Sequence, residues 1–317
     1  MVASLALVGL CASLAHARSA PAPTTTLVSV NATGTDSGDS LSFGSSISAN
    51  GRLVAFGSNA DDLVPNDSNG HDDIFVRNLK TRTTRLVSVN QAGTGSGDGE
   101  SYRGIITPNG RFVVFLSTAG NLVPNDTNGL TDVFLRNLRT GKTRMVSVNQ
   151  AGTDGGDGLS FAASVNPNGR FVAFESYATD LVSQTENGFA AVFVRDMRRR
   201  QTQMVSVNQA GTANGNGDAG IPTLTPDGRF VAFESTASDL VPLSDSNGVD
   251  DVFVRNLRKG TTTLVSVNQA GTGAGDALSE APVISTNGRL VMFESDADDL
   301  VATDTNGFYD VFVRDLK

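Results

Sequence analysis

A repeated unit constrains the fold of this chain more than any other feature of its sequence. The pentapeptide (L/M)-V-S-V-N begins at positions 27, 86, 145, 204 and 264, so successive copies lie 59, 59, 59 and 60 residues apart. A second marker, (N/D)-G-R before an apolar run, begins at positions 50, 109, 168, 227 and 287, and a third, (V/I)-F-(V/L)-R-(N/D), begins at 74, 133, 192, 252 and 311. A fixed period is typical of proteins built from stacked copies of one unit. The sequence therefore predicts five copies over residues 24–317.

Each copy contains four segments with the composition of short β-strands. In the fourth copy these are residues 219–225, 229–235, 251–257 and 262–268, and no segment has helical periodicity over a useful length. Phe230 and Ala232 point to one side of their strand, while Val231 and Phe233 point to the other. Both faces of the sheet are therefore apolar and need cover. Sheets arranged radially, each between two neighbours, meet this need, so the pattern predicts an all-β fold of four-stranded antiparallel propeller blades.

The same segments resemble a known repeat. TPDGRFVAFES at residues 225–235, followed by DVFVRNL at 251–257, is similar to the WD40-like (PD40) repeat of the TolB type, and the match recurs five times over residues 24–317. The resemblance implies a β-propeller. It leaves the activity open, because such repeats occur in binding proteins, in gating domains of peptidases and in polysaccharide-active proteins. The G-x-S-x-G motif of the peptidase members is missing, so their chemistry does not carry over.

The first and last segments of the repeat array are complementary. Residues 24–31 (TTTLVSVN) have the sequence of a fourth strand, and residues 311–317 (VFVRDLK) have that of a third strand. If residues 24–31 complete the last blade, no strand edge is left unpaired. We therefore expect residues 24–317 to form a single five-bladed β-propeller, closed by its N-terminal strand, and we expect a monomer.

Charge and rare residues exclude several classes of function. The chain has 24 Lys and Arg against 33 Asp and Glu, a net charge of −9, which argues against nucleic acid or an anionic membrane surface as the main partner. It has one Cys (Cys11), no Trp and two His (His16 and His71). This composition excludes disulfides within the chain, thiolate zinc sites, multi-histidine metal sites and thiol catalysis.

The N-terminal residues resemble an export signal. Residues 2–14 form an apolar run too short to span a bilayer, and Ala15-His16-Ala17 supplies a small-residue cleavage site. We expect a signal peptide at residues 1–17, with cleavage no later than residue 20. The mature protein is then expected in the periplasm, at the cell surface or outside the cell, with no segment inserted in the membrane.

The loops between the second and third strands carry candidate metal ligands. In the first copy these are Asp62, Asp67, Asn69 and Asp73, whose oxygens surround an Asn-Gly turn much as in calcium loops. The pattern recurs as Asn121, Asp126, Asn128 and Asp132, as Asp239, Asp245, Asn247 and Asp251, and as Asp299, Asp304, Asn306 and Asp310.

The third copy distinguishes two interpretations of this pattern. It keeps Asn187-Gly188 but has Thr185 and Ala191 in place of the two loop acids. A simple Asx turn requires only Asn-Gly, whereas a shared ion requires the acids together. Their joint loss favours Ca²⁺ binding by the other four loops, and an ordinary Asx turn is the alternative.

The Gly-rich loops leading into each first strand place a second set of acids on the same face. These acids are Asp39, Asp98, Asp157, Asp218 and Asp276, which we expect near the mouth of a central channel. They either cap turns in which Gly supplies positive φ, or form a ring of carboxylates that binds a cation or partner.

Three functions are compatible with the sequence. The first is an exported, non-catalytic propeller that binds a protein or glycan through its acidic loops, with no catalytic residues, because the acids recur in near-equivalent copies. The second is a carbohydrate-active enzyme using Glu100 and Glu280, which occur in single copies. The third is a purely structural surface protein. We expect His71 to be a surface substitution, and the third-strand arginines to have the option of pairing with Glu175, Glu234 and Glu294.

Overall fold

The described part of the chain is built from β-strands. A computed structural model describes residues 23–184 and 187–317, and its strands form five antiparallel sheets. The expected signal peptide lies outside these residues, as does Thr185. No helix in the described ranges is long and apolar enough to cross a bilayer. The expected all-β class is confirmed.

Each sheet corresponds to one copy of the repeat, and its strands pair in chain order. The first sheet contains β1 (Ser42–Ile47), β2 (Leu53–Ser58), β3 (Asp73–Asn78) and β4 (Thr83–Leu86). The second contains β5 (Ser101–Ile106), β6 (Phe112–Ser117), β7 (Asp132–Asn137) and β8 (Lys142–Met145). The third contains β9 (Ser160–Val165), β10 (Phe171–Ser176), β11 (Ala191–Asp196) and β12 (Gln201–Met204). The fourth contains β13 (Ala219–Leu224), β14 (Phe230–Ser235), β15 (Asp251–Asn256) and β16 (Thr261–Leu264), and the fifth contains β17 (Ser279–Ile284), β18 (Leu290–Ser295) and β19 (Asp310–Asp315).

The fourth strand of each complete sheet is shorter than the sequence predicts. In the fourth copy, β16 ends at Leu264, and the next residues leave the ladder after Val265 N–H donates to the Val252 carbonyl at 2.7 Å. The segment that follows turns into the long loop, which is closed by a bridge between Val267 and Ala274. The first three strands of this copy lie within one residue of the expected ranges.

The core lies between the sheets, as two apolar faces per sheet require. Val231, Ala232 and Phe233 of β14 are fully buried, and Phe233 stacks on Phe253 of β15 with ring centroids 5.7 Å apart. Each of the five sheets contains an equivalent Phe pair. Full burial of one such side chain stabilises the fold by roughly 1.5–3 kcal/mol. Because the apolar clusters combine residues of adjacent sheets, the same burial holds neighbouring sheets together.

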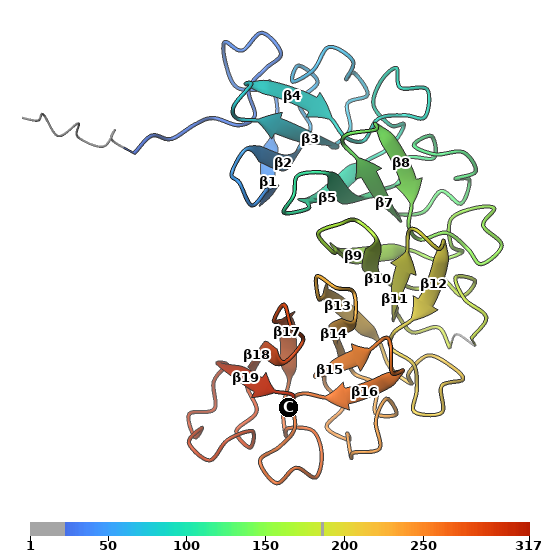
Figure 1. Cartoon of the computed structure of the whole chain (residues 1–317), viewed down its shortest axis with the longest axis vertical. Helices are drawn as coiled ribbons and strands as arrows, with labels where there is room; N and C mark the ends of the chain where they lie inside the picture. The colour runs from blue at the N-terminus through green and yellow to red at the C-terminus, as the bar shows by residue number, and fades with distance from the viewer. Residues whose placement is uncertain (1–22, 185–186) are drawn as a thin grey trace, which may run out of the picture.

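The five sheets are arranged as an open arc. The first strands (β1, β5, β9, β13 and β17) line its inner side, and the fourth strands lie on its outer side (Figure 1). The fifth sheet has three strands, because residues 24–27 form no strand with β19. Val28 instead packs against the core of the first sheet, and Val30 bridges Ser37. The closure expected from residues 24–31 is therefore not made in the structure.

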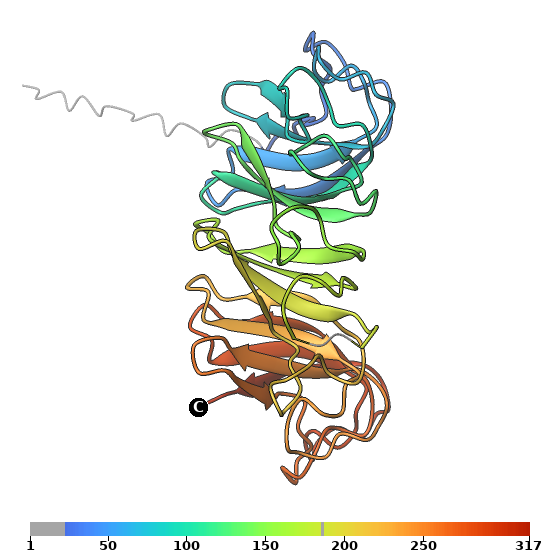
Figure 2. The same cartoon turned by 90° about the vertical axis from the view of Figure 1, so that its right-hand side faces the viewer.

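The two ends of the strands carry different connections. Short turns join the first strand to the second and the third to the fourth, and long loops make the other connections. Figure 2 shows the strands running across the view, with the C-terminus on the side of the short turns and the long loops on the opposite side. We call the surface formed by these loops the long-loop face. The metal-ligand and channel-mouth residues expected from the sequence lie in these long loops or at the first residue of the strand that follows.

Candidate cation and partner site on the long-loop face

The long loops are bonded to one another in the same way in every copy. The loop that leads into β5 donates Gln91 N–H to the Asn121 carbonyl, at 2.7 Å, in the loop between β6 and β7. Equivalent bonds run from Ala32 to Asp62, from Gln150 to Asp180, from Gln209 to Asp239 and from Gln269 to Asp299. The two loops of each sheet therefore form one unit.

The first residue of each expected metal loop accepts a hydrogen bond from the neighbouring long loop of the same sheet. Asp62 Oδ1 accepts Asp39 N–H at 3.1 Å, and Asn121, Asp239 and Asp299 accept the equivalent N–H groups. Asp180 makes the same bond with Asp157 in the third copy, where the other loop acids are missing. Each of these side chains thus connects the two long loops of its sheet. The residues are Asp62, Asn121, Asp239 and Asp299.

The remaining loop acids form a buried pair. In the first copy Asp73 is fully buried, and its carboxylate accepts Ser88 Oγ–H and, at 2.9 Å, Asn69 Nδ2–H. Asp67 is 5% exposed, and its Oδ1 has no hydrogen-bond partner. Burial raises the pKa of Asp73 to about 8; the bond from Ser88 opposes this rise, and the charge of Asp67 adds to it. Burial also raises the pKa of Asp67.

The buried pair recurs in the second and fourth copies, and the fifth copy has the same two acids in half-buried positions. The equivalents are Asp126 with Asp132, Asp245 with Asp251, and Asp304 with Asp310. In each, the Asn of the Asn-Gly turn donates to the second acid at 2.7–2.9 Å. Burial, in each case the largest cause, raises the pKa of Asp126 and of Asp251 to about 7, and of Asp132 and of Asp245 to about 6. Asp245 Oδ2 and Asp304 Oδ1 are again unpartnered.

The third copy replaces the pair with an amide. Ala191 removes the second acid, and Asn214, 1% exposed, fills the space. Asn214 Nδ2 donates to Asn187 Oδ1 at 3.0 Å and to the Phe189 carbonyl at 3.1 Å, and its Oδ1 accepts Ser206 Oγ–H at 3.4 Å. Sequence reasoning missed Asn214. Its signal was a large polar residue where the other copies have Ser37, Ser96, Gly155 and Ala274.

The donor set of each pair fits a hard cation only in part. Two carboxylates supply the charge, and in the first, fourth and fifth copies one carboxylate oxygen has no hydrogen-bond partner. Among the described residues, no group of three or more His, Cys, Asp or Glu side chains is placed to hold a metal ion. A cation bound here would need backbone carbonyls or water to complete six to eight oxygen ligands.

The acids expected at a channel mouth lie on the exposed surface of the loop units. Asp39, Asp98, Asp157 and Asp276 occupy equivalent exposed positions, and Asn216 holds that position in the fourth copy. Asp218 lies two residues further on, where its Oδ1 accepts Ala190 N–H of the preceding sheet at 2.7 Å. The five acids expected to form a ring therefore do not hold equivalent positions: four share one exposed position, and Asp218 joins two sheets.

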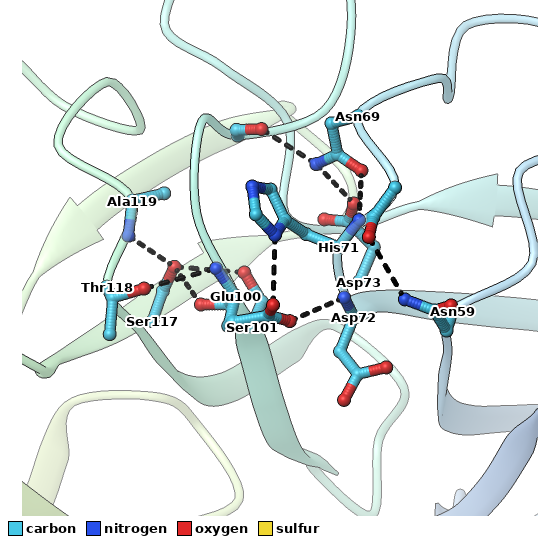
Figure 3. Close-up of polar contacts among 12 residues, drawn as sticks. Asn59, Asn69, His71, Asp72, Asp73, Glu100, Ser101, Ser117, Thr118 and Ala119 are labelled. Carbon is cyan, nitrogen blue, oxygen red and sulfur yellow. Dashed lines mark hydrogen bonds and ion pairs between the residues drawn. The ribbon is translucent and has the colours of Figure 1, made fainter.

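Glu100 has the same bridging role between the first and second sheets. Its Oε2 accepts Asp72 N–H at 2.6 Å, and its Oε1 lies 2.9 Å from His71 Nδ1 (Figure 3). His71 therefore lies at the surface, as expected, and contacts Glu100 there. Glu280 belongs to β17, and β9 and β13 lie between β5 and β17 along the arc (Figure 1). The structure does not bring Glu100 and Glu280 together.

A second-strand glutamate, Glu234, bridges two sheets instead of pairing with an arginine. Glu234 Oε2 accepts Ala281 N–H of the next sheet at 2.9 Å, and Ala281 has a φ of 52°. Burial raises the pKa of Glu234 to about 7, and the nearby carboxylates of Asp250, Glu280 and Glu175 add to the rise. The third-strand arginines donate to fourth-strand threonines, as Arg255 does to Thr262 at 2.9 Å. The expected Arg–Glu pairing is therefore wrong for the described pairs.

Sheet order and repeated junctions show five similar antiparallel sheets, one for each copy of the repeat. No protein-family profile matches the sequence, and no curated protein does. The structure is similar to that of a putative TolB from Agrobacterium tumefaciens, with 14% identity, coverage of 87% of this chain and 78% of that chain, and a TM-score of 0.48. It is also similar to TolB from Acinetobacter baumannii, with 15% identity, coverage of 91% and 59%, and a TM-score of 0.45. A prolyl endopeptidase structure matches with 10% identity, coverage of 87% and 36%, and a TM-score of 0.49. TolB structures are thus among the solved structures to which this chain is similar, in line with the resemblance seen in the sequence.

Proposed function

We propose that this chain is an exported, non-catalytic binding protein whose long-loop face binds a protein or glycan partner, and whose buried Asp pairs bind Ca²⁺. The observation that carries the proposal is the recurrence of the buried pair. Two carboxylates are buried together in the first, second and fourth copies without a cationic side chain bonded to them. Uncompensated buried charge is costly, so each pair needs either a proton or a cation.

The third copy supports a cation. Where Ala191 removes one carboxylate, the neutral Asn214 occupies the space and satisfies Ser206. A neutral hydrogen-bonding group is thus sufficient to build the junction. The acids of the other copies must then serve something besides the fold, and Ca²⁺ binding accounts for two carboxylates facing each other.

The cation proposal is tested by calorimetric titration of the chelator-treated protein with CaCl₂. We expect saturable binding that weakens in Asp126→Asn. Asp180→Asn is the matched control, because it removes one loop carboxylate from the copy that lacks a pair. Ca²⁺ should raise the Tm of the wild type by mass action, and less so that of Asp126→Asn. No heat of binding in the wild type, or equal responses from the two variants, would leave the loops as Asx turns.

The partner proposal rests on the exposed row of Asp39, Asp98, Asp157 and Asp276. Repeated equivalent acids suit multivalent contacts better than catalysis, which needs carboxylates in different environments. A panel of purified envelope proteins and glycans, probed with and without Ca²⁺, should yield a partner that the four Asp→Asn substitutions together release. A partner retained by this quadruple variant would bind another surface.

A further inference from the structure

The two ends of the arc carry the separated halves of one sheet. β19 repeats β15, with DVFVRD against DVFVRN, and residues 24–27 repeat β16, with TTTL in both. In the fourth sheet these strands pair in a defined register, with Phe253 opposite Leu264, Val254 opposite Thr263 and Arg255 opposite Thr262. In the described structure β19 pairs with β18 alone.

The separation leaves apolar side chains exposed at both ends. Val252, Val254 and Leu264 of the fourth sheet are 0%, 3% and 2% exposed. Their equivalents at the ends of the arc, Val311, Val313 and Leu27, are 68%, 62% and 52% exposed. An apolar edge strand with free backbone groups is a template for pairing with another strand.

A side-chain bond specifies the same pairing. In each four-stranded sheet, the Arg of the third strand donates Nη1–H to the Thr opposite it on the fourth strand. The bonds are Arg77 to Thr84 and Arg136 to Thr143 at 2.8 Å, Arg195 to Thr202 at 2.7 Å, and Arg255 to Thr262 at 2.9 Å. Arg314 and Thr25 hold these positions in β19 and in residues 24–27.

The faces between sheets match as well. At each internal junction, the first residue of a sheet donates its N–H to a backbone carbonyl of the preceding sheet. That carbonyl belongs to the residue just before the third strand. The bonds run from Ser101 to Asp72, Ser160 to Thr131, Ala219 to Ala190 and Ser279 to Asp250, at 2.7–2.9 Å. At the ends of the arc, Ser42 and Tyr309 hold the two positions.

Aromatic side chains also make close contacts across the internal junctions. Phe112, Phe171 and Phe230 pack on the turn glycines of the next sheet, leaving no room for a Cβ. The equivalent Leu290 of the last sheet is 41% exposed, and the space beside Gly51 of the first sheet is open.

The geometry of the arc decides which molecule supplies the missing strand. The four internal junctions use the same bonds, so each repeats nearly the same step from sheet to sheet. After five sheets this step has left the first and last sheets at opposite ends of the molecule (Figures 1 and 2). The next step of the same kind therefore leads to a second copy. We propose that residues 24–27 of one copy pair with β19 of another, so that the protein assembles head to tail.

This assembly replaces the monomer expected from the sequence. Its contacts are heterologous, so it forms a closed ring if the rotation closes and a chain of molecules if it does not. It makes a shared sheet with one strand from a neighbouring copy, and it extends the row of long loops across the junction. The inference does not depend on Ca²⁺ or on a partner.

Cysteine cross-linking tests the pairing directly in the full chain with Cys11→Ser. Thr25→Cys and Arg314→Cys are placed on separate chains, folding is checked by circular dichroism, and the mixture is oxidised. By the register of β15 and β16, these residues face each other, so we expect a covalent dimer on a non-reducing gel. Thr26→Cys mixed with Arg314→Cys is the matched control, because neighbouring residues of a strand point to opposite faces, and it should remain monomeric.

The chain carrying both Thr25→Cys and Arg314→Cys separates closure within one molecule from assembly. Covalent species of two or more chains support the proposal, whereas an internal disulfide in a monomer overturns it in favour of a closed single ring. Light scattering provides a second readout without cysteines. Val313→Lys should convert the assembly to monomers, while Phe189→Lys, in the third copy, should not. A wild type that is monomeric at all concentrations tested would also overturn the proposal.

Discussion

Single residues on the long-loop face show how a buried neighbour sets the chemistry of a carboxylate. Asp62 and Asp73 belong to the same loop pattern, yet Asp73 is fully buried beside Asp67 and Asp62 accepts a loop N–H near the surface. The Asp and Asn pattern could be read from the sequence, and it led to the loops that contain the buried carboxylates. The partition of those residues into a buried pair and a loop lock could not, because it depends on which backbone N–H groups the neighbouring loop brings within reach.

Stability without Ca²⁺ should fall as the pH rises from about 4 to about 8. The folded-state pKa of Asp73 is about 8, above its ordinary value of 3.8, so the folded state holds a proton that the unfolded state has released in this window. We expect the Tm in chelator to be at least ~2 °C lower at pH 8 than at pH 5. Asp67→Asn should reduce the fall, because it removes the charge beside Asp73. A Tm that rises over this range would contradict the protonated pair.

Glu100 and Glu280 should not support catalysis. Glu100 is bonded to Asp72 N–H and His71, and Glu280 lies three sheets away along the chain. We expect no release of reducing sugar from a panel of polysaccharides by the wild type, Glu100→Gln or Glu280→Gln. Turnover by the wild type that both substitutions abolish would establish the carbohydrate-active alternative.

At the scale of elements, apolar alternation and turn residues were sufficient to predict the strands, but they did not predict the structure of the loops. The second strands were predictable because both of their faces are apolar, as Val231 and Phe233 show. The end of β16 at Leu264 was not, because Ser266 leaves the ladder to donate to buried Asp251. The spacing of the fourth Gly-rich loop also misled sequence reasoning: Asn216, rather than Asp218, holds the surface position.

Asn214 should be a structural requirement of the third junction. Its side chain bonds Asn187, the Phe189 carbonyl and Ser206 while 1% exposed, so Asn214→Ala leaves buried polar groups without partners. The free energy of unfolding should fall by about 1–3 kcal/mol, measured by urea denaturation. Thr212→Ala, at an exposed position of the same loop, is the control and should change it by less than about 0.5 kcal/mol. Equal stabilities would show that the amide bonds are dispensable.

At the scale of the whole molecule, the sequence predicted the pairing of strands better than the path of the arc. The complementarity of residues 24–27 and β19 is visible in two identical tetrapeptides, TTTL at 24–27 and at 261–264. Whether the partners meet within a chain depends on the angle between sheets, which many side chains such as Phe112, Phe171 and Phe230 set together. No single residue reports that angle, so the open arc had to come from the structure.

A peptide of residues 24–31 should compete with the assembly proposed above. TTTLVSVN supplies the strand that β19 lacks, and it would cover Val311 and Val313 without bringing a second molecule. Light scattering should then show monomers at saturating peptide, because each bound peptide occupies one acceptor edge. The same peptide with Leu27→Asp should act weakly, since the equivalent Leu264 is 2% exposed and a carboxylate there would be buried without a partner. If light scattering shows the same assembly with the unmodified peptide as with the Leu27→Asp peptide, β19 is not the surface that joins the copies.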